Sequence, residues 1–445
     1  MKLKKRFFVA LLSMAMVFAL SACGGGGSGS DGGEGASTGD AGTEAEAPQG
    51  DAPEFIKIGI PNPSTGNIAG FGVGTPYVED LVVQAVNAQG GIYIEEYDKK
   101  IPIKIYVVDT ESDPTKASEV TQQLIENEGV NMLLARHTPN TAVPVSIMAE
   151  KFGIPCVSNG CPTAPWKDAG PYEWVFHSFW DIDDALENFV GMWKELGYGP
   201  GAVVGFLFPN DSDGLAWAAK ATALCEREGF VISDPGQYPI GNQDWTPIIN
   251  KFKADKVQII VGDDVAPDFT SFSSQASQQS LKYDLVTMGR AFLFPADANS
   301  NPPEIAAGLT NEVWWSPAFP FKSSLDGMTC AEFVEKYEEN QKTPWASNLG
   351  DKYSGMEIAV DALTRAASLD PEKIRAALAE TDLDTLSAHI KYDPETHVSV
   401  TPIVAGQWKL NEAGDGVYLT VVYNGRYPEI PTDAKLELPA DMLKR

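Results

Sequence analysis

Short, almost continuously apolar runs alternate with segments of helical period from residue 55 onward. Apolar runs of roughly four to eight residues are typical of strands that are buried on both faces of a parallel sheet. We expect strands at residues 55–60, 103–109, 130–135, 202–208, 257–261 and 285–288.

The segments between the first strands carry helix start and stop signals. An apolar stripe with helical spacing runs from Val78 to Val86, and Gly90 follows as a stop signal. Asp113 before Pro114 is typical of a helix N-cap followed by proline at the first helical position. Strands that alternate with helices in this way predict an α/β fold with parallel sheets covered on both faces.

The strand–helix rhythm weakens near residue 178 and again near residue 315, and from about residue 389 the chain reads as strands with turns. We therefore expect two lobes joined by three crossovers, near 178, 315 and 391. The first lobe would comprise residues 54–178 and 315–390, and the second 179–314 and 391–445. Ligands of open α/β sheets lie beyond the carboxyl ends of the strands, so the sequence predicts a binding cleft there.

The first 53 residues have the character of an export signal and a tether. Four basic residues lie within residues 1–6, and residues 7–20 are apolar except for Ser13. This run is too short for a membrane span but fits a secretory signal peptide. Residues 24–50 are rich in glycine and poor in apolar side chains, which is typical of a flexible linker.

The junction Leu20-Ser21-Ala22-Cys23 resembles the lipobox of bacterial lipoproteins, in which the cysteine carries diacylglycerol. We expect a signal peptide at 1–22, lipidation at Cys23 and a linker at 23–53. The protein would then be extracytoplasmic and lipid-anchored at the cell membrane. The alternative is an ordinary signal peptide with an incidental cysteine.

Composition narrows the classes of function. The chain of 445 residues has 61 acidic and 33 basic side chains, for a net charge of -28. A phosphate backbone or an anionic membrane requires a basic surface, so we expect no nucleic-acid partner. The sequence shows neither the spacing of metal ligands nor the arrangement of a nucleophile and a base. We therefore expect no cofactor, no metal and no enzymatic activity; an exported enzyme is a remote alternative. Four cysteines after Cys23 either pair or stay reduced: Cys156, Cys161, Cys225 and Cys330.

Short motifs recur in a characteristic order along the chain. They are Ile56-Lys-Ile-Gly-Ile60, Ser64-Thr-Gly66, Ala69-Gly-Phe-Gly72, Asn87-Ala-Gln-Gly-Gly-Ile92, Asp109 with Asp113-Pro114, Gly153-Ile-Pro155, Asp213-Gly214 and Met288-Gly289. This order resembles that of the periplasmic solute-binding proteins of the branched-chain amino-acid type, the receptors of ABC importers. The likeness is good from residue 55 to about 320 and looser beyond.

The resemblance implies a type I periplasmic binding protein fold, with two Rossmann-like lobes, three hinge crossovers and a small solute in the cleft. It also implies ABC permease and ATPase subunits as partners. A surface receptor of the same fold that reports a solute to a sensor is an alternative that the sequence does not separate.

On the first lobe, the resemblance assigns an aromatic cover to Phe71 and the solute's carboxylate and amine to the loops after the third and fourth strands. The residues it implies are Phe71, His137, Thr138, Asn140, Asn159, Gly160, Cys161 and Thr163. Cys161 before Pro162 departs from the family pattern. Phe71 alternatively packs on its own lobe, and His137 alternatively is a structural histidine.

On the second lobe, the family pattern is broken. The family has tyrosines where this chain has Asp213 and Asp263, and an acidic residue for the solute's ammonium where this chain has Arg290. These three residues either form a charged cluster for a polar solute or pair with one another and leave a less polar pocket.

Trp180, Trp314 and Trp315 lie at two crossovers, and they either line the cleft or pack the hinge; we expect Trp315 to contact the solute. Loss of the acidic residue argues against a leucine-like solute. We expect a small polar or aromatic carboxylate, with Arg136 and Arg290 as its partners.

Overall fold

The computed structural model describes residues 50–443. The expected signal peptide, Cys23 and most of the expected linker lie outside the described residues. Between residues 50 and 443, no helix is long and apolar enough to cross a bilayer.

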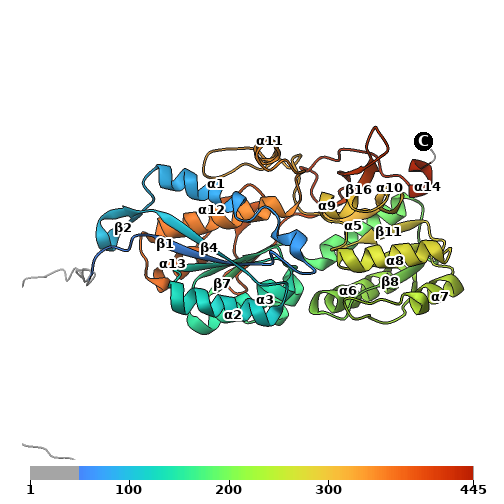
Figure 1. Cartoon of the computed structure of the whole chain (residues 1–445), viewed down its shortest axis with the longest axis horizontal. Coiled ribbons are helices and arrows are strands. Elements are labelled where there is room, and N and C mark those ends of the chain that lie inside the picture. Colours follow the sequence, from blue (N-terminus) through green and yellow to red (C-terminus); the bar gives the residue numbers. More distant parts are fainter. Residues whose placement is uncertain (1–49, 444–445) are drawn as a thin grey trace, which may run out of the picture. The chain divides into compact units, whose positions relative to one another are not determined.

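Six parallel strands form the sheet of the first lobe, in the order β15-β7-β6-β5-β1-β4 (Figure 1). They are β1 (Ile56–Asn62), β4 (Ile103–Asp109), β5 (Met132–Arg136), β6 (Cys156–Asn159), β7 (Val175–Ser178) and β15 (Val398–Ser399). Every residue of β5, β6 and β7 is buried. In β5 this burial explains the apolar run from Met132 to Ala135. The first three predicted strands and their parallel pairing are confirmed.

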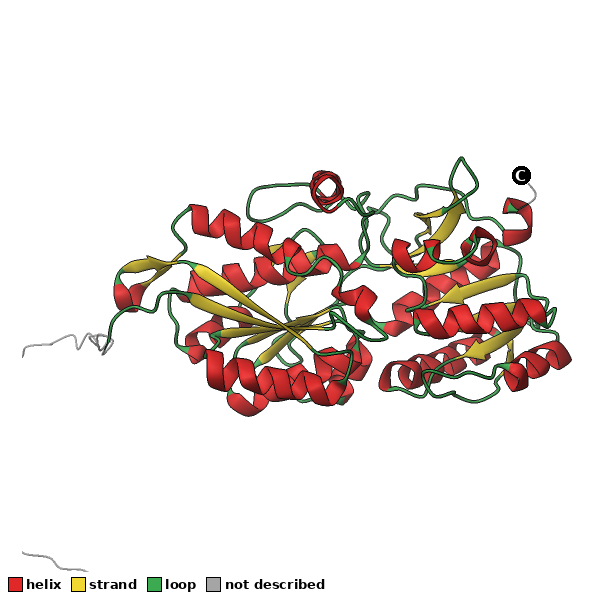
Figure 2. Cartoon of the chain, in the orientation of Figure 1, coloured by secondary structure: helices red, strands yellow, loops and turns green. Residues whose placement is uncertain are grey.

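Helices cover both faces of this sheet (Figure 2). One face carries α1 (Tyr77–Ala88) and α12 (Asn348–Ala366), and the other carries α2 (Pro114–Gln123), α3 (Pro139–Phe152) and α4 (Thr163–Asp168). The predicted cap at the start of α2 is confirmed, because the Asp113 side chain accepts a hydrogen bond of 2.8 Å from the Lys116 backbone N–H. Further elements of this lobe are α11 (Cys330–Gln341), α13 (Pro371–Ala379) and the hairpins β2 (Ile92–Ile94) with β3 (Lys99–Ile101) and β13 (Asp382–Asp384) with β14 (His389–Lys391).

Seven strands form the second sheet, in the order β17-β16-β12-β11-β10-β8-β9. They are β8 (Val203–Leu207), β9 (Val231–Ser233), β10 (Ile259–Gly262), β11 (Leu285–Met288), β12 (Thr310–Val313), β16 (Val404–Leu410) and β17 (Val417–Tyr423). The first five pair in parallel, and β16 joins β12 and β17 in antiparallel fashion. All predicted strands of this lobe are confirmed.

The helices of the second lobe again lie on both faces of the sheet. The side chains of α5 (Ile182–Glu195) and α6 (Ser212–Glu228) belong to one apolar cluster, and those of α7 (Thr246–Asp255) and α8 (Ala266–Gln278) to another. Short helices complete the lobe: α9 (Pro295–Asn299), α10 (Pro303–Ala306) and α14 (Pro439–Met442).

The chain passes between the lobes after β7, after β12 and after β15. The third passage lies at residues 400–403, later than the expected position near 391, because β15 still pairs with β7 of the first sheet. The His177 backbone N–H also donates to the His397 carbonyl over 2.8 Å. A two-residue strand leaves no hydrophobic period in the sequence, so its position was not predictable.

The four described cysteines are buried and unpaired: Cys156, Cys161, Cys225 and Cys330. Burial raises the pKa of each thiol above its ordinary value. They therefore act as small apolar side chains in the core.

Candidate functional site

A pocket lies where the carboxyl ends of the strands of both lobes meet. Its empty space is about 250 Å³, a figure that includes space open to solvent. The first lobe supplies Phe71, Thr138, Gly160 and Pro162, and the rest of the lining is Phe179, Trp180, Asp213, Trp217, Asp263, Arg290, Glu312 and Trp314.

Phe71 covers the pocket and touches the other lobe. It lies in a 3-10 helix (Ala69–Gly72), and its ring meets that of Phe294 edge-on at 4.9 Å. The Asn348 side chain of α12 donates to the Phe71 carbonyl over 2.9 Å and so fixes the loop. Phe71 therefore contacts both lobes, so its packing is not confined to its own lobe.

Thr138 is the first-lobe hydroxyl at the pocket. It is the N-cap of α3, and its Oγ1 is buried without a hydrogen-bond partner. Two successive non-glycine residues, His137 and Thr138, have positive φ values of 71° and 63°. Backbone strain of this kind is concentrated at ligand sites, where the surrounding fold maintains it.

Arg136 does not reach the pocket. Its guanidinium is buried and forms an ion pair of 2.6 Å with Glu79 of α1. Lys352 lies in the same cluster and donates to the Val73 carbonyl; burial lowers the pKa of Lys352 to about 7. Arg136 is therefore part of the interior of the first lobe. It does not lie where it could bind the carboxylate of a solute.

The other predicted first-lobe residues surround the pocket without lining it. The Asn140 side-chain amide donates a hydrogen bond of 3.2 Å to the Asp211 carboxylate of the second lobe. The Asn159 side-chain amide donates to the Asp351 backbone carbonyl over 2.8 Å. The Thr163 hydroxyl donates to the Phe179 carbonyl over 3.1 Å at the first crossover. His137 and Cys161 are buried next to these residues, and burial keeps the pKa of His137 well below its ordinary value, so the ring is neutral.

Arg290 is surrounded by carboxylates of the second lobe. Its Nη1 and Nη2 donate to the two oxygens of Asp211 over 2.7 and 3.1 Å, and its Nε lies 3.0 Å from a carboxylate oxygen of Asp263 and 3.6 Å from Asp213. Nε and Nη2 also donate to the Asp263 carbonyl. Arg290 and Asp263 pair with each other, but Asp213 keeps one buried oxygen without a partner, so the structure combines features of the two arrangements left open by the sequence.

The acidic side chains outnumber this arginine. Burial raises the pKa of Asp213 to about 7, against the opposing attraction of Arg290. Burial also raises the pKa of Asp263 and of Glu312 well above their ordinary values. Asp211 alone has a lowered pKa, because Arg290 and the Gly214 N–H outweigh its burial. The pocket therefore contains carboxyl groups that are expensive to ionise without an added cation.

The sequence profile described as "Periplasmic binding protein" matches residues 55–415. The chain belongs to the periplasmic binding protein family. The predicted resemblance to the branched-chain amino-acid type and the predicted type I fold are confirmed, and the family comprises solute-binding proteins of the extracytoplasmic space rather than enzymes.

Two curated relatives illustrate the similarity. A Leu/Ile/Val-binding protein homolog of Brucella abortus is 22% identical over 362 residues, which cover 81% of this chain and 92% of the relative. A leucine-, isoleucine-, valine-, threonine- and alanine-binding protein of Pseudomonas aeruginosa is 19% identical over 357 residues, covering 80% and 91%.

Solved structures share the fold of this periplasmic binding protein. A leucine-binding protein from Thermotoga maritima superposes with a TM-score of 0.69 at 19% identity, covering 83% of this chain and 99% of the other. A solute-binding protein of an ABC transporter from Rhodopseudomonas palustris, in complex with 3,4-dihydroxybenzoic acid, gives 0.67 at 18% identity, covering 86% and 99%.

The sequence prediction missed Glu312 of this binding protein. Strands β11 and β12 run in parallel with Met288 opposite Asn311, so Glu312 is level with Gly289 on the neighbouring strand. It is 3% exposed, and its Oε2 has no hydrogen-bond partner. The available signal was an acidic residue two positions before Trp314, in the strand Thr310-Asn311-Glu312-Val313.

The prediction that Trp315 contacts the solute is not supported, because Trp315 does not line the pocket. Its indole N–H donates to the Leu386 carbonyl over 3.0 Å, and its ring packs on Phe333 at 5.7 Å in the first-lobe core. Trp314 lines the pocket instead. The chain bends directly after β12, and Trp315 is held in the first-lobe core while Trp314 reaches the pocket.

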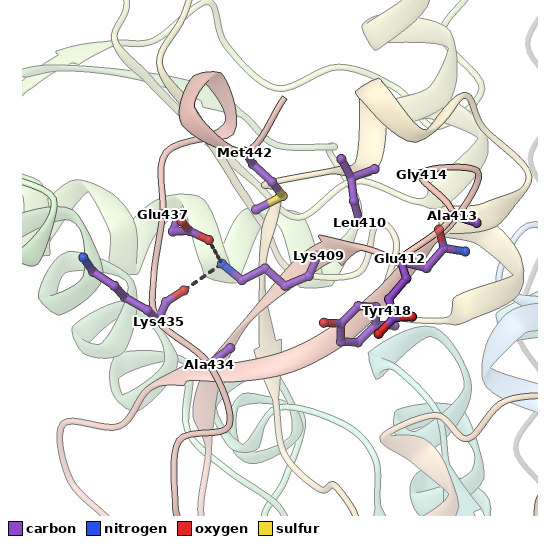
Figure 3. Close-up of a pocket in the computed structure, with 11 residues that line it drawn as sticks. Lys409, Leu410, Glu412, Ala413, Gly414, Tyr418, Ala434, Lys435, Glu437 and Met442 are labelled. Atoms are coloured by element: carbon purple, nitrogen blue, oxygen red, sulfur yellow. Dashed lines mark hydrogen bonds and ion pairs between the residues drawn. The ribbon is translucent and has the colours of Figure 1, made fainter. Parts of the chain in front are cut away.

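A second hollow lies on the C-terminal hairpin of the second lobe (Figure 3). Lys409 extends into it and pairs with Glu437 over 3.2 Å, and also donates to the Lys435 carbonyl over 2.7 Å. None of its lining residues carries a buried polar atom without a partner. A solute in this hollow would therefore find fewer polar atoms that lack a hydrogen-bond partner than it would in the interlobe pocket.

Proposed function

We propose that this periplasmic binding protein is the lipid-anchored receptor of an ABC importer. It captures a small organic solute between its lobes and delivers the solute to a membrane permease. Cys23 is the anchor in this proposal, and the permease and its ATPase are the partners.

One observation carries the proposal. The interlobe pocket collects buried polar atoms without hydrogen-bond partners from both lobes, among them Oγ1 of Thr138, Oδ1 of Asp213 and Oε2 of Glu312. Leaving such groups unsatisfied is costly, so a fold retains them where a ligand supplies the missing partners. Related proteins named as leucine-binding or solved with a dihydroxybenzoate support a solute of that size.

Contacts between the lobes support a closing mechanism. Asn140 and Phe71 of the first lobe meet Asp211 and Phe294 of the second. A solute that bridges the lobes favours the closed arrangement by its differential affinity for that arrangement. A permease then distinguishes loaded from empty receptor by shape.

Binding is tested with the mature lipoprotein in mild detergent, by thermal shift and then calorimetry against amines, amino acids, aromatic acids, amides and sugars. A solute that binds the folded state raises the melting temperature. Failure of every class to bind would refute the receptor assignment.

Delivery is tested by reconstituting the permease and ATPase in vesicles with the loaded receptor. Solute uptake that depends on the receptor is expected. Binding without any uptake would favour a sensory receptor. Anchoring is tested by incorporation of a labelled fatty acid, which a Cys23→Ser variant should abolish.

A further inference from the structure

We infer that the solute is a small organic cation, an amine with an apolar body, whose charge is held by the carboxyl groups of Asp213 and Glu312. This inference rests on the proposed receptor function and names the class of its solute. It replaces the carboxylate solute that Arg136 and Arg290 led us to expect from the sequence.

The ionisable groups of the pocket favour a cation. Asp213, Asp263 and Glu312 line it, and Arg290 is the single basic side chain among the lining residues. With all three carboxyl groups ionised, the formal charge of these four residues is -2, and burial opposes that ionisation in the absence of an added cation. A solute that brings one positive charge reduces this imbalance, whereas a carboxylate increases it.

Asp213 and Glu312 each have a carboxyl oxygen that can still accept a hydrogen bond. Oδ1 of Asp213 and Oε2 of Glu312 are buried without hydrogen-bond partners, and the two residues are 2% and 3% exposed. Asp213 comes from the first turn of α6 and Glu312 from β12, so two independent elements direct acceptors into one space. An ammonium group has donors only and satisfies such a pair directly. Among the described residues no acidic group has the geometry of a metal site, so an organic cation is the better occupant.

Aromatic rings form the rest of the wall. The rings of Phe179, Trp180 and Trp314 form a connected cluster with centroid separations of 5.0, 5.5 and 6.1 Å. Trp217 extends this cluster from Trp180 at 5.9 Å. Aromatic faces attract cations through their quadrupoles and also accept the apolar body of an amine.

The pocket has no available cation for a carboxylate. All three guanidinium nitrogens of Arg290 already bond to Asp211 or Asp263, and Arg136 is paired with Glu79 outside the pocket. The polar features left in the lining are the Thr138 hydroxyl, the start of α3, and the indole N–H groups of Trp180 and Trp314, which are buried without a hydrogen-bond partner. These can hold a hydroxyl or a carboxylate as a secondary group, but they do not require one.

A pH dependence follows from the same geometry. The charged and titratable groups around Asp213 are Arg290, Asp211, Asp263, Glu312 and the Cys161 thiol. A bound cation favours the ionised form of Asp213 and lowers its pKa in the complex. Affinity for an amine is therefore greatest above the pKa of the empty site, about 7, and falls as the pH decreases through it. A carboxylate solute would show the opposite trend.

The test compares solutes that share one carbon skeleton. Calorimetry on the mature lipoprotein measures isoamylamine, leucine and isocaproate, then phenethylamine, phenylalanine and hydrocinnamate, with choline as a quaternary cation. We expect the amine of each series to bind at least about tenfold more tightly than the acid, and more tightly than the amino acid. Tighter binding of the amino acids or acids would overturn the inference while leaving the receptor function intact. Tightest binding of a neutral amide or sugar would overturn it in the same way, and binding of no class at all would refute the receptor itself.

Variants of the pocket residues test which side chains hold the charge of the bound amine. Glu312→Gln keeps the shape of the side chain and should weaken amine binding roughly ten- to hundredfold, as expected for a hydrogen bond to a charged group. Glu304→Gln, at an exposed acidic residue of the same lobe, should have no effect. Trp314→Leu should weaken binding roughly three- to tenfold, and Trp345→Leu, outside the pocket, should not.

Each variant is first checked by its melting transition. If Glu312→Gln does not fold, Asp213→Asn takes its place with the same expected loss. Unchanged amine affinity in a folded Glu312→Gln or Asp213→Asn variant would overturn the assignment of the charge to these residues.

Discussion

Replacing Arg290 by methionine removes the one basic side chain among the carboxylates of the pocket lining. Met fills a similar volume, so the change tests charge rather than packing. The guanidinium is 3% exposed and makes two hydrogen bonds to the Asp211 carboxylate and two to the Asp263 carbonyl. Removing one partner of a buried ion pair typically costs about 3–5 kcal/mol of unfolding free energy.

The pH dependence of this loss can be worked out from Asp211. In the native protein its pKa is lowered, so it is ionised and paired. Without Arg290, burial raises the pKa of Asp211 against the remaining hydrogen bonds from Gly214 and Asn140, so we expect the folded variant to hold a proton there that the unfolded chain releases above its ordinary pKa of 3.8. The folded state then binds one more proton than the unfolded state, so stability decreases as the pH rises, by about 1.4 kcal/mol per pH unit. Between about pH 5 and pH 7 the loss should therefore grow, by at most about 2.7 kcal/mol.

The assay is urea unfolding of the ligand-free protein, followed by tryptophan fluorescence at several pH values. Arg375→Met is the matched control, because Arg375 is 34% exposed and pairs with Glu372 over 2.8 Å at the surface. Its loss should stay below about 1 kcal/mol. An Arg290→Met loss that is equally small, or that does not change with pH, would refute the reasoning.

Three further outcomes are expected. Asn140→Ala removes the bond to Asp211 between the lobes and should weaken solute binding roughly two- to tenfold; calorimetry that shows full affinity would contradict a role in closure. Gly350→Ala should destabilise the first lobe by about 1–3 kcal/mol, because a Cβ there would lie 2.3 Å from the Trp315 ring, whereas Gly199→Ala has open space and should be neutral in the same urea assay. A thiol reagent should label the native protein poorly and the guanidinium-unfolded protein fully, and rapid native labelling would contradict the burial of Cys156, Cys161, Cys225 and Cys330.

The chain's local patterns determined most of the architecture. Buried parallel strands need apolar residues on both faces, so β1, β8, β10 and β11 were visible as continuous runs. Capping is also local, so the start of α2 followed from Asp113 and Pro114. The third crossover was displaced because β15 has two residues and owes its place to pairing with β7.

The chemistry of the pocket was decided by the tertiary structure. Arg290 and Asp211 are 79 residues apart in the chain, and their pairing depends on where β11 and the start of α6 meet. Glu312 joins the pocket because of the register between β11 and β12, and Trp314 rather than Trp315 joins it because of the direction in which the chain leaves β12. The amino-acid sequence alone specifies which charged and aromatic side chains a protein has. Whether a charge is neutralised or offered to a solute depends on neighbours that only packing brings within bonding distance.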